Sequence, residues 1–169
     1  KATWVVLFNK TLTSQAGITD LYETVKDNKW TLELLNQYGQ QAAQDLNGDG
    51  KMAWGDDIFG IGLQHEVVVP LILGGEEKLF DIMEDGSFIN NMSSSHIIEG
   101  MEKVHAFMNS GNHILNAQLA GANSDNWEGF RGLFKSDLIS FYMAPLTQAS
   151  VVSGDMQSDF GILPFPKLS

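Results

Sequence analysis

Oxygen-bearing side chains recur at alternate positions in the segment DLNGDGKMAWGD, residues 45–56, which we call the Asp45 loop. The segment fits the calcium-loop pattern D-x-[DN]-x-[DN]-G-x5-E except at the last position, where aspartate replaces glutamate. A calcium ion takes about six to eight oxygen ligands. The spacing predicts a Ca²⁺ site built from the side chains of Asp45, Asn47, Asp49 and Asp56 and the backbone carbonyl of Lys51. A solvated turn without a metal is the alternative interpretation.

The Asp45 loop matches a structural ion site better than a calcium sensor. Position nine is Ala53, which offers no side-chain oxygen, and Asp56 is one methylene shorter than the usual glutamate. A helix–loop–helix sensor needs a second amphipathic helix, but the loop is followed by DIFGIG, whose glycines favour a short strand. We therefore expect the ion to pin the C-terminal end of the preceding helix.

The other candidate motifs do not assemble an active site. The segment HEVVV begins like H-E-x-x-H at His65, but Val69 stands where the second histidine must be, which excludes that zinc motif. His96, His105 and His113 are nine and eight residues apart, so they fall on different faces of a helix or beyond its end. No nucleophile elbow, phosphate loop or dinucleotide fingerprint occurs in the sequence. We expect a protein that is not an enzyme and has no catalytic cofactor.

Composition narrows the class further. The chain has 169 residues, 43% of them hydrophobic, which suits one domain with a substantial core. Its formal net charge of −11 disfavours nucleic acid and anionic lipid as partners. The absence of cysteine excludes disulfides and thiol chemistry. No apolar run reaches the roughly 18 to 20 residues of a membrane span.

Apolar periodicity and turn residues predict alternating strands and helices, which favours an α/β or mixed architecture. Strands are expected over residues 3–10, 57–62, 138–145 and 159–166, with a hairpin over 78–90. Helices are expected over residues 18–29, 32–44, 63–75, 93–111, 123–137 and 147–152, the second capped by Thr31. A buried-type strand so close to Lys1 suggests either a piece of a larger protein or a processed N-terminus.

Three segments together resemble a known family. They are WVVLFNKTLTSQAGITDLYETVKDNKWTLELLNQYGQQAAQDLNGDGK, LISFYMAPLTQASVV and DFGILPFPKL. Their order and spacing are similar to those of the family 1 extracellular solute-binding proteins of bacterial ABC importers, which are maltose-binding-protein-like. The resemblance extends over nearly the whole chain.

The resemblance implies a fold, partners and a location. The fold would be the second lobe of a class II periplasmic-binding-protein-like α/β protein, with helices packed on a small mixed sheet. Residues 1–169 would form a single domain, the central part of that lobe. Its partners would be the first lobe of the same protein, a small-molecule solute and the ABC permease subunits. The full-length protein would be extracellular or periplasmic, as a membrane-anchored lipoprotein.

The resemblance also implies ligand contacts, in two segments that would face the cleft between the lobes. These residues are Gln64, His65, Glu66, Ala144, Pro145, Leu146 and Thr147. Gln64 and Glu66 could bind hydroxyls or a cation, or could be solvated residues at a helix start. Sugar binders of the family place aromatic rings in these segments, but here Leu146 and Val68 occupy those positions. Trp127 and Phe130 could form a substitute platform, or could pack a short helix on the core.

We expect the solute to be a carbohydrate. The alternative is a calcium-dependent interaction module at the cell surface, whose function would reside in the Asp45 loop itself. Such modules usually carry paired loops, and this sequence has one.

Overall fold

The computed structural model describes residues 3–74, 78–116, 120 and 127–168. The bounds of its elements are β1 (Trp4–Asn9), α1 (Lys10–Gln15), α2 (Leu21–Lys26), α3 (Leu32–Ala42), β2 (Phe59–Leu63), the 3₁₀ turn η1 (His65–Val67), α4 (Val68–Leu73), β3 (Phe80–Ile82), β4 (Phe88–Asn90), α5 (Ser95–Met108), β5 (Ile114–Leu115), α7 (Trp127–Lys135), β6 (Ile139–Pro145), α8 (Thr147–Val152) and β7 (Phe160–Pro164). Within the described part of the chain, no helix is long and apolar enough to cross a membrane.

A five-stranded mixed sheet organises the body of the molecule, in the order β5-β2-β6-β1-β7. β2 pairs in parallel with both β5 and β6, whereas β1 pairs in antiparallel with both β6 and β7. Every residue of β2 is buried, as is expected for a strand covered on both faces. The predicted small mixed sheet with packed helices is confirmed.

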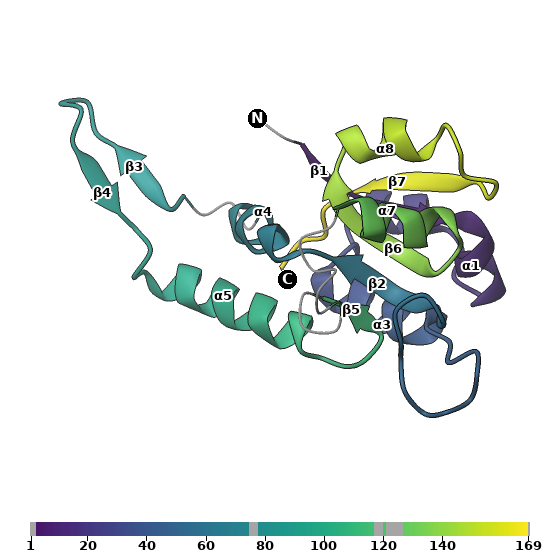
Figure 1. The fold of residues 1–169 in the computed structure, drawn as a ribbon. Helices are drawn as coiled ribbons and strands as arrows, with labels where there is room; N and C mark the ends of the chain where they lie inside the picture. The colour runs from purple at the N-terminus through teal and green to yellow at the C-terminus, as the bar shows by residue number, and fades with distance from the viewer. Residues whose placement is uncertain (1–2, 75–77, 117–119, 121–126, 169) are drawn as a thin grey trace.

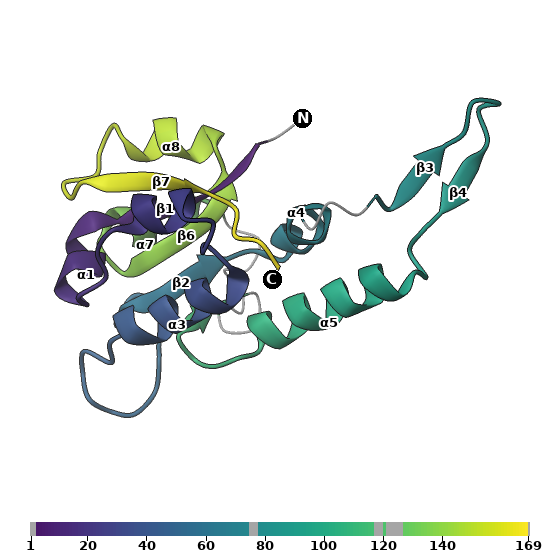
Figure 2. The same cartoon turned by 180° about the vertical axis from the view of Figure 1, so that it is seen from behind.

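Helices cover the sheet from two sides. One hydrophobic cluster packs α3, α4 and α5 against strand residues such as Phe141 and Met143. The other packs α7 and α8 against the alternate strand residues, among them Tyr142 and Ala144. α7 lies in front of the sheet in Figure 1, and α3 lies in front of it when the molecule is seen from behind in Figure 2. The period-two alternation of β6 therefore divides its side chains between two cores.

Most predicted elements are present, with differences at their ends. Thr31 caps α3, its hydroxyl accepting from the Leu34 amide at 3.2 Å. The helix predicted over residues 63–75 is a 3₁₀ turn followed by a short α-helix. It begins later than predicted, because residue 63 still belongs to β2. Two elements were not predicted. α1 begins directly after β1, where the Asn9 side chain accepts from the Leu12 amide at 3.0 Å, and β5 has two residues.

The hairpin β3–β4 and the beginning of α5 project away from the sheet in both views (Figures 1 and 2). The predicted turn is present, with Gly86 at φ +81°. Its strands contribute little to the core: Ile82 and Phe88 are 72% and 71% exposed.

Close contact between α3 and β2 depends on two glycines. A Cβ atom added at Gly60 would lie 1.9 Å from the backbone oxygen of Gly39. The obstacle is backbone, which can move only if the whole helix moves away from the strand. Absence of both side chains therefore sets the distance between this helix and the sheet.

We expect Gly60→Ala to destabilise the fold by about 3 kcal/mol, because the new methyl group must push α3 off the sheet. Gly132, in α7, is the matched control, since a Cβ there meets nothing within 4 Å. Gly132→Ala should be neutral or stabilising by up to about 1 kcal/mol. Urea unfolding followed by circular dichroism measures both, and equal stabilities of the two variants would contradict the contact.

Candidate functional site

One edge of the sheet brings together segments that are far apart in the sequence. β2 and β6 run in parallel and end there at Leu63 and Pro145, and β1 begins there at Trp4, paired with Pro145. β7 ends at the same edge, because Val5 pairs with Pro164. In open α/β sheets, ligands bind outside the carboxyl ends of the parallel strands. We call this candidate site the carboxyl edge (residues 4, 64–66, 127, 145–148 and 165).

The first predicted segment, residues 64–66, lies at the carboxyl edge directly after β2. Gln64 is only 1% exposed, so the interpretation that it is a solvated residue is wrong. His65 and Glu66 are exposed and form a loose pair, with 3.8 Å between Nδ1 and Oε2. Ligand binding by these three residues stays a prediction.

The second predicted segment, residues 144–147, also lies at this edge, but its side chains differ in direction. Ala144 is fully buried and packs in the core with α7 and α8, and its backbone pairs with Val5 of β1. Leu146 and Thr147 are exposed, while Pro145 is half-buried. The Leu146 amide donates to the Thr3 carbonyl at 2.7 Å, which ties the turn to the start of β1. Their contact with a ligand also stays a prediction.

Three aromatic side chains cluster at the carboxyl edge. The ring centroid of Trp4 lies 6.0 Å from that of Trp127 and 6.0 Å from that of Phe165. All three residues are half-buried, and we call them the aromatic trio. Phe130, which was predicted to form a ligand platform with Trp127 or to pack on the core, is fully buried, and its ring centroid lies 5.3 Å from that of Trp54. The interpretation that Phe130 packs on the core is correct, and the ligand contact is wrong.

Polar side chains lie beside the aromatic trio on α7, α8 and β6. Arg131 Nη1 donates to Gln148 Oε1 at 3.2 Å. Tyr142 is fully buried, and this burial raises the pKa of its hydroxyl well above the usual value, an effect that the Arg131 charge opposes and the Glu66 charge reinforces. The tyrosine hydroxyl is therefore neutral, and the charges of one cation and one anion act on it.

Sequence reasoning missed five of these side chains: Trp4, Phe165, Arg131, Tyr142 and Gln148. The available signals were weak, since an aromatic residue at a strand end or a tyrosine in an apolar run usually belongs to the core. Only the antiparallel pairing of β1 with β6 and β7 brings the two aromatic residues together.

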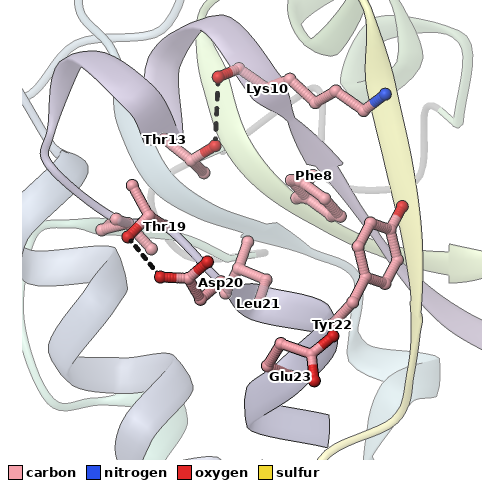
Figure 3. Close-up of a pocket in the computed structure, with 9 residues that line it drawn as sticks. Phe8, Lys10, Thr13, Thr19, Asp20, Leu21, Tyr22 and Glu23 are labelled. Carbon is pink, nitrogen blue, oxygen red and sulfur yellow. Dashed lines mark hydrogen bonds between the residues drawn. The ribbon is translucent and has the colours of Figure 1, made fainter.

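A hollow of about 310 Å³ lies at the opposite edge, between α1 and α2 (Figure 3). Phe8, Ile18 and Leu21 line it together with polar residues at its rim. Thr19 donates to the Asp20 carboxylate at 3.1 Å, so part of that rim is already hydrogen-bonded.

His113, away from this hollow, is buried and already has a hydrogen-bond partner. Its Nε2 atom lies 2.7 Å from the amide oxygen of Asn36, and burial lowers the pKa of its imidazole.

Comparison with solved structures shows that the chain has the fold of the α/β lobe of ABC-transporter solute-binding proteins, and the predicted fold class is confirmed. No protein-family profile and no curated protein sequence match the chain. Solved structures do, and they show the fold, at identities of 12% to 18%.

Three of these structures illustrate the likeness. The ABC substrate-binding protein Lmo0181 of Listeria monocytogenes, in complex with cycloalternan, has a TM-score of 0.69 and 12% identity, over 99% of this chain and 38% of its own. The maltodextrin-binding MalE of Bdellovibrio bacteriovorus, bound to maltotriose, has a TM-score of 0.63 and 18% identity, over 96% and 36%. UgpB of Mycobacterium tuberculosis, in complex with glycerophosphocholine, has a TM-score of 0.61 and 14% identity, over 98% and 37%. The chain therefore spans less than two-fifths of the length of each.

The Asp45 loop lies at the far end of β2, away from the carboxyl edge, since it precedes that strand. Its side chains bond to its own backbone. Asp45 accepts from the amides of Gly48 and Gly50 at 2.7 Å each. Asn47 accepts from the Asp49 amide at 2.9 Å, in the manner of an Asx turn. The residues at positions 1 and 3 of the predicted calcium pattern thus stabilise the turn by themselves.

Asp57, rather than the predicted Asp56, closes the Asp45 loop. Asp57 is fully buried and accepts from the Leu46 amide with one oxygen and from the Ala53 amide with the other, both at 2.8 Å. Asp56 is exposed. The buried carboxylate joins the two ends of the loop, which is the anchoring role that the sequence assigned to an ion.

Calcium ligation has no further support from the geometry. The described residues contain no group of three or more His, Cys, Asp or Glu side chains that could hold a metal ion. The turn itself suits the pattern, because Gly50, at position 6, has φ +79°. A calcium ion bound by Asp45, Asn47, Asp49, Lys51 and Asp56 therefore stays a prediction.

We expect Asp57→Ala to destabilise the fold by about 2 kcal/mol, because two backbone amides lose a charged acceptor. The neighbouring Asp56→Ala is the control and should change stability by less than about 0.5 kcal/mol. Urea unfolding of both variants measures the difference. A larger effect at Asp56 would show that the loop is closed by the residue that the sequence pattern predicts.

If the Asp45 loop takes up calcium, millimolar Ca²⁺ should raise the Tm by about 3 °C relative to EDTA, because the ion binds only the folded loop. Asp49→Ala should abolish the rise. Thermal melts followed by circular dichroism measure both. Identical melting temperatures of the unaltered protein in Ca²⁺ and in EDTA would show that the Asp45 loop does not bind calcium.

Proposed function

We propose that this chain is one lobe of the solute-binding component of an ABC importer, and that it captures a carbohydrate between the carboxyl edge and a second lobe. The observation that carries the proposal is the aromatic trio at the carboxyl edge, where Glu66 and Gln148 also lie and where Gln148 accepts a hydrogen bond from Arg131. Ligand sites combine apolar and aromatic walls with a few placed polar groups. The edge has both kinds of group.

Carbohydrate is the solute class that this combination suits. One face of a pyranose ring presents C–H groups, which pack on an aromatic ring, while its hydroxyls need both donors and acceptors. Leu146 does not supply an aromatic ring, but Trp4, Trp127 and Phe165 gather beside it from three other segments. The trio therefore supports a sugar ligand, although the two segments expected to carry rings lack them.

The structural neighbours support a small polar solute in general. Two of those described above were solved with an oligosaccharide and one with glycerophosphocholine. Glycerophosphocholine carries a quaternary ammonium cation, and aromatic rings bind such cations as well as the C–H faces of sugars. The aromatic trio therefore suits both solutes, and we propose the sugar because two of the three neighbours were solved with one.

The remaining parts of the proposal concern the whole protein. A second lobe would close over the solute by a hinge motion, and the loaded protein would deliver it to the permease subunits. The protein would act outside the cytoplasm, in the extracellular or periplasmic space, as a lipoprotein and without catalysis. A calcium-dependent interaction module remains the rival function. Its loop would act at the opposite edge from the aromatic trio.

Isothermal titration calorimetry of the full-length protein tests the solute class. We expect heat from at least one of maltotriose, D-mannitol and D-tagatose, more than from glycerophosphocholine, and none from amino acids or dipeptides. Heat from amino acids or dipeptides alone would overturn the carbohydrate proposal.

In the same titration, Trp127→Ala should weaken binding of the responding sugar by about tenfold, because the stacking surface is lost. Trp54→Ala is the control, since Trp54 packs on the core residue Phe130 and belongs to the Asp45 loop rather than to the carboxyl edge. It should cost stability but leave the affinity unchanged. Equal affinities of the Trp127 variant and the unaltered protein would exclude the aromatic trio from the site.

A further inference from the structure

The hydroxyl of Tyr142 is a buried polar group without a partner. The residue is 0% exposed, and no hydrogen bond to its Oη atom occurs among the described residues. Folded proteins pair nearly all buried polar groups, and an unpaired one costs stability. A side chain that carries this cost needs an explanation, because phenylalanine would fill the same space without it.

Tyr142 lies on β6 between its neighbours α7 and β2, near the carboxyl edge. Its ring packs against Phe134 of α7, with 5.7 Å between the ring centroids. Its backbone pairs with Gly62 of β2, four residues before Glu66. The charges of Arg131 and Glu66 both act on the hydroxyl, in opposite directions. The Tyr142 side chain therefore lies in the core beside α7, on a strand that ends three residues later at the edge where the solute is proposed to bind.

The two charged neighbours are themselves loosely held. Arg131 makes one hydrogen bond, to the neutral Gln148, at the long distance of 3.2 Å, and no ion pair within the described residues. Among the described residues, Glu66 has the single 3.8 Å contact between its Oε2 atom and His65 Nδ1. A guanidinium with unused donors and a carboxylate with unused acceptors thus flank a hydroxyl that can do both.

We infer that Tyr142, Arg131 and Glu66 determine solute specificity, and that the Tyr142 hydroxyl finds its missing partner in a hydroxyl group of the solute. The inference rests on the proposed function, which it deepens. Arg131 donates to solute oxygens, Glu66 accepts from solute hydroxyls, and Tyr142 can donate or accept. The solute class is a neutral, hydroxyl-rich molecule.

The balance of charge excludes an acidic sugar as the preferred solute. One cation and one anion flank the hydroxyl, so their charges cancel, and the chain as a whole carries −11. A carboxylate on the solute would pair with Arg131 but would be repelled by Glu66. A neutral hydroxyl satisfies all three side chains without repulsion.

Solute binding must uncover the hydroxyl, since it has no exposed surface. Side-chain rotations at binding sites are common even where the backbone does not move. Arg131 is the side chain best suited to rotate, because one weak bond to Gln148 holds it. Its movement would exchange that bond for a bond to the solute.

Tyr142→Phe in the full-length protein tests the inference, with calorimetry against maltotriose, D-mannitol, D-tagatose and the acidic sugar D-glucuronate. We expect the variant to bind the responding neutral sugar about fivefold to tenfold more weakly, because one hydrogen bond is lost. Its Tm without sugar should stay the same or rise, because a buried unpaired hydroxyl has been removed.

Ser140→Ala is the matched control. Ser140 lies two positions earlier in β6, is also fully buried, and also has a hydroxyl without a partner among the described residues. Its removal should change the Tm in the same direction as Tyr142→Phe and leave the affinity unaltered.

The outcomes separate the inference from the proposed function. Unchanged affinity of Tyr142→Phe, with sugar binding by the unaltered protein, overturns the inference alone. A lower Tm of Tyr142→Phe overturns it too, since the hydroxyl would then be a structural bond. Stronger heat from D-glucuronate than from every neutral sugar overturns the neutral solute class. Silence of the unaltered protein across all the sugars overturns the proposed function and the inference together.

Discussion

The position of β1 between β6 and β7 is the constraint on which the rest of the structure depends. β1 hydrogen-bonds to both neighbours in antiparallel, so its first residue lies beside the last residues of both. Trp4, the turn after Pro145 and Phe165 consequently share one edge, although they are separated by more than a hundred residues of sequence at the widest. A register shift of one residue would turn the side chains of β1 to the opposite face, and Trp4 would lose its contacts with Trp127 and Phe165.

The two hydrophobic cores make this edge rigid enough to hold a site. β6 gives Phe141 and Met143 to one core and Tyr142 and Ala144 to the other, so the strand cannot rotate without unpacking both. Stability of the body is thus secured by apolar contacts on both faces. A polar group that those contacts do not need, such as the Tyr142 hydroxyl, can then be kept for function at a tolerable loss of stability.

Much of the fold could be predicted from sequence because it is encoded locally. The helix cap at Thr31, the turn at Gly86 and the apolar run of β6 each depend on a few neighbouring residues, and all three are present. The candidate site could be predicted only in part. Its two predicted segments meet at one end of the sheet, and their contact with a solute stays a prediction. The association of Trp4 with Phe165 depends on long-range strand pairing, which no local pattern specifies.

The Asp45 loop illustrates how a motif can be located from sequence while the contacts that hold its ends together are not. The pattern made Asp56 the closing residue, whereas the buried acceptor of two backbone amides is Asp57. Asp57, and not Asp56, is the residue next to the bridge between Ile58 and Gln44, which brings the two ends of the loop together. The Asp57 side chain is fully buried at this junction. The loop therefore fastens the connection from α3 to β2 at one end of the strand, while residues 64–66 begin the candidate site at the other end. Anchorage and binding are thus separated along one buried strand, and the loop can stabilise the carboxyl edge without contacting a solute.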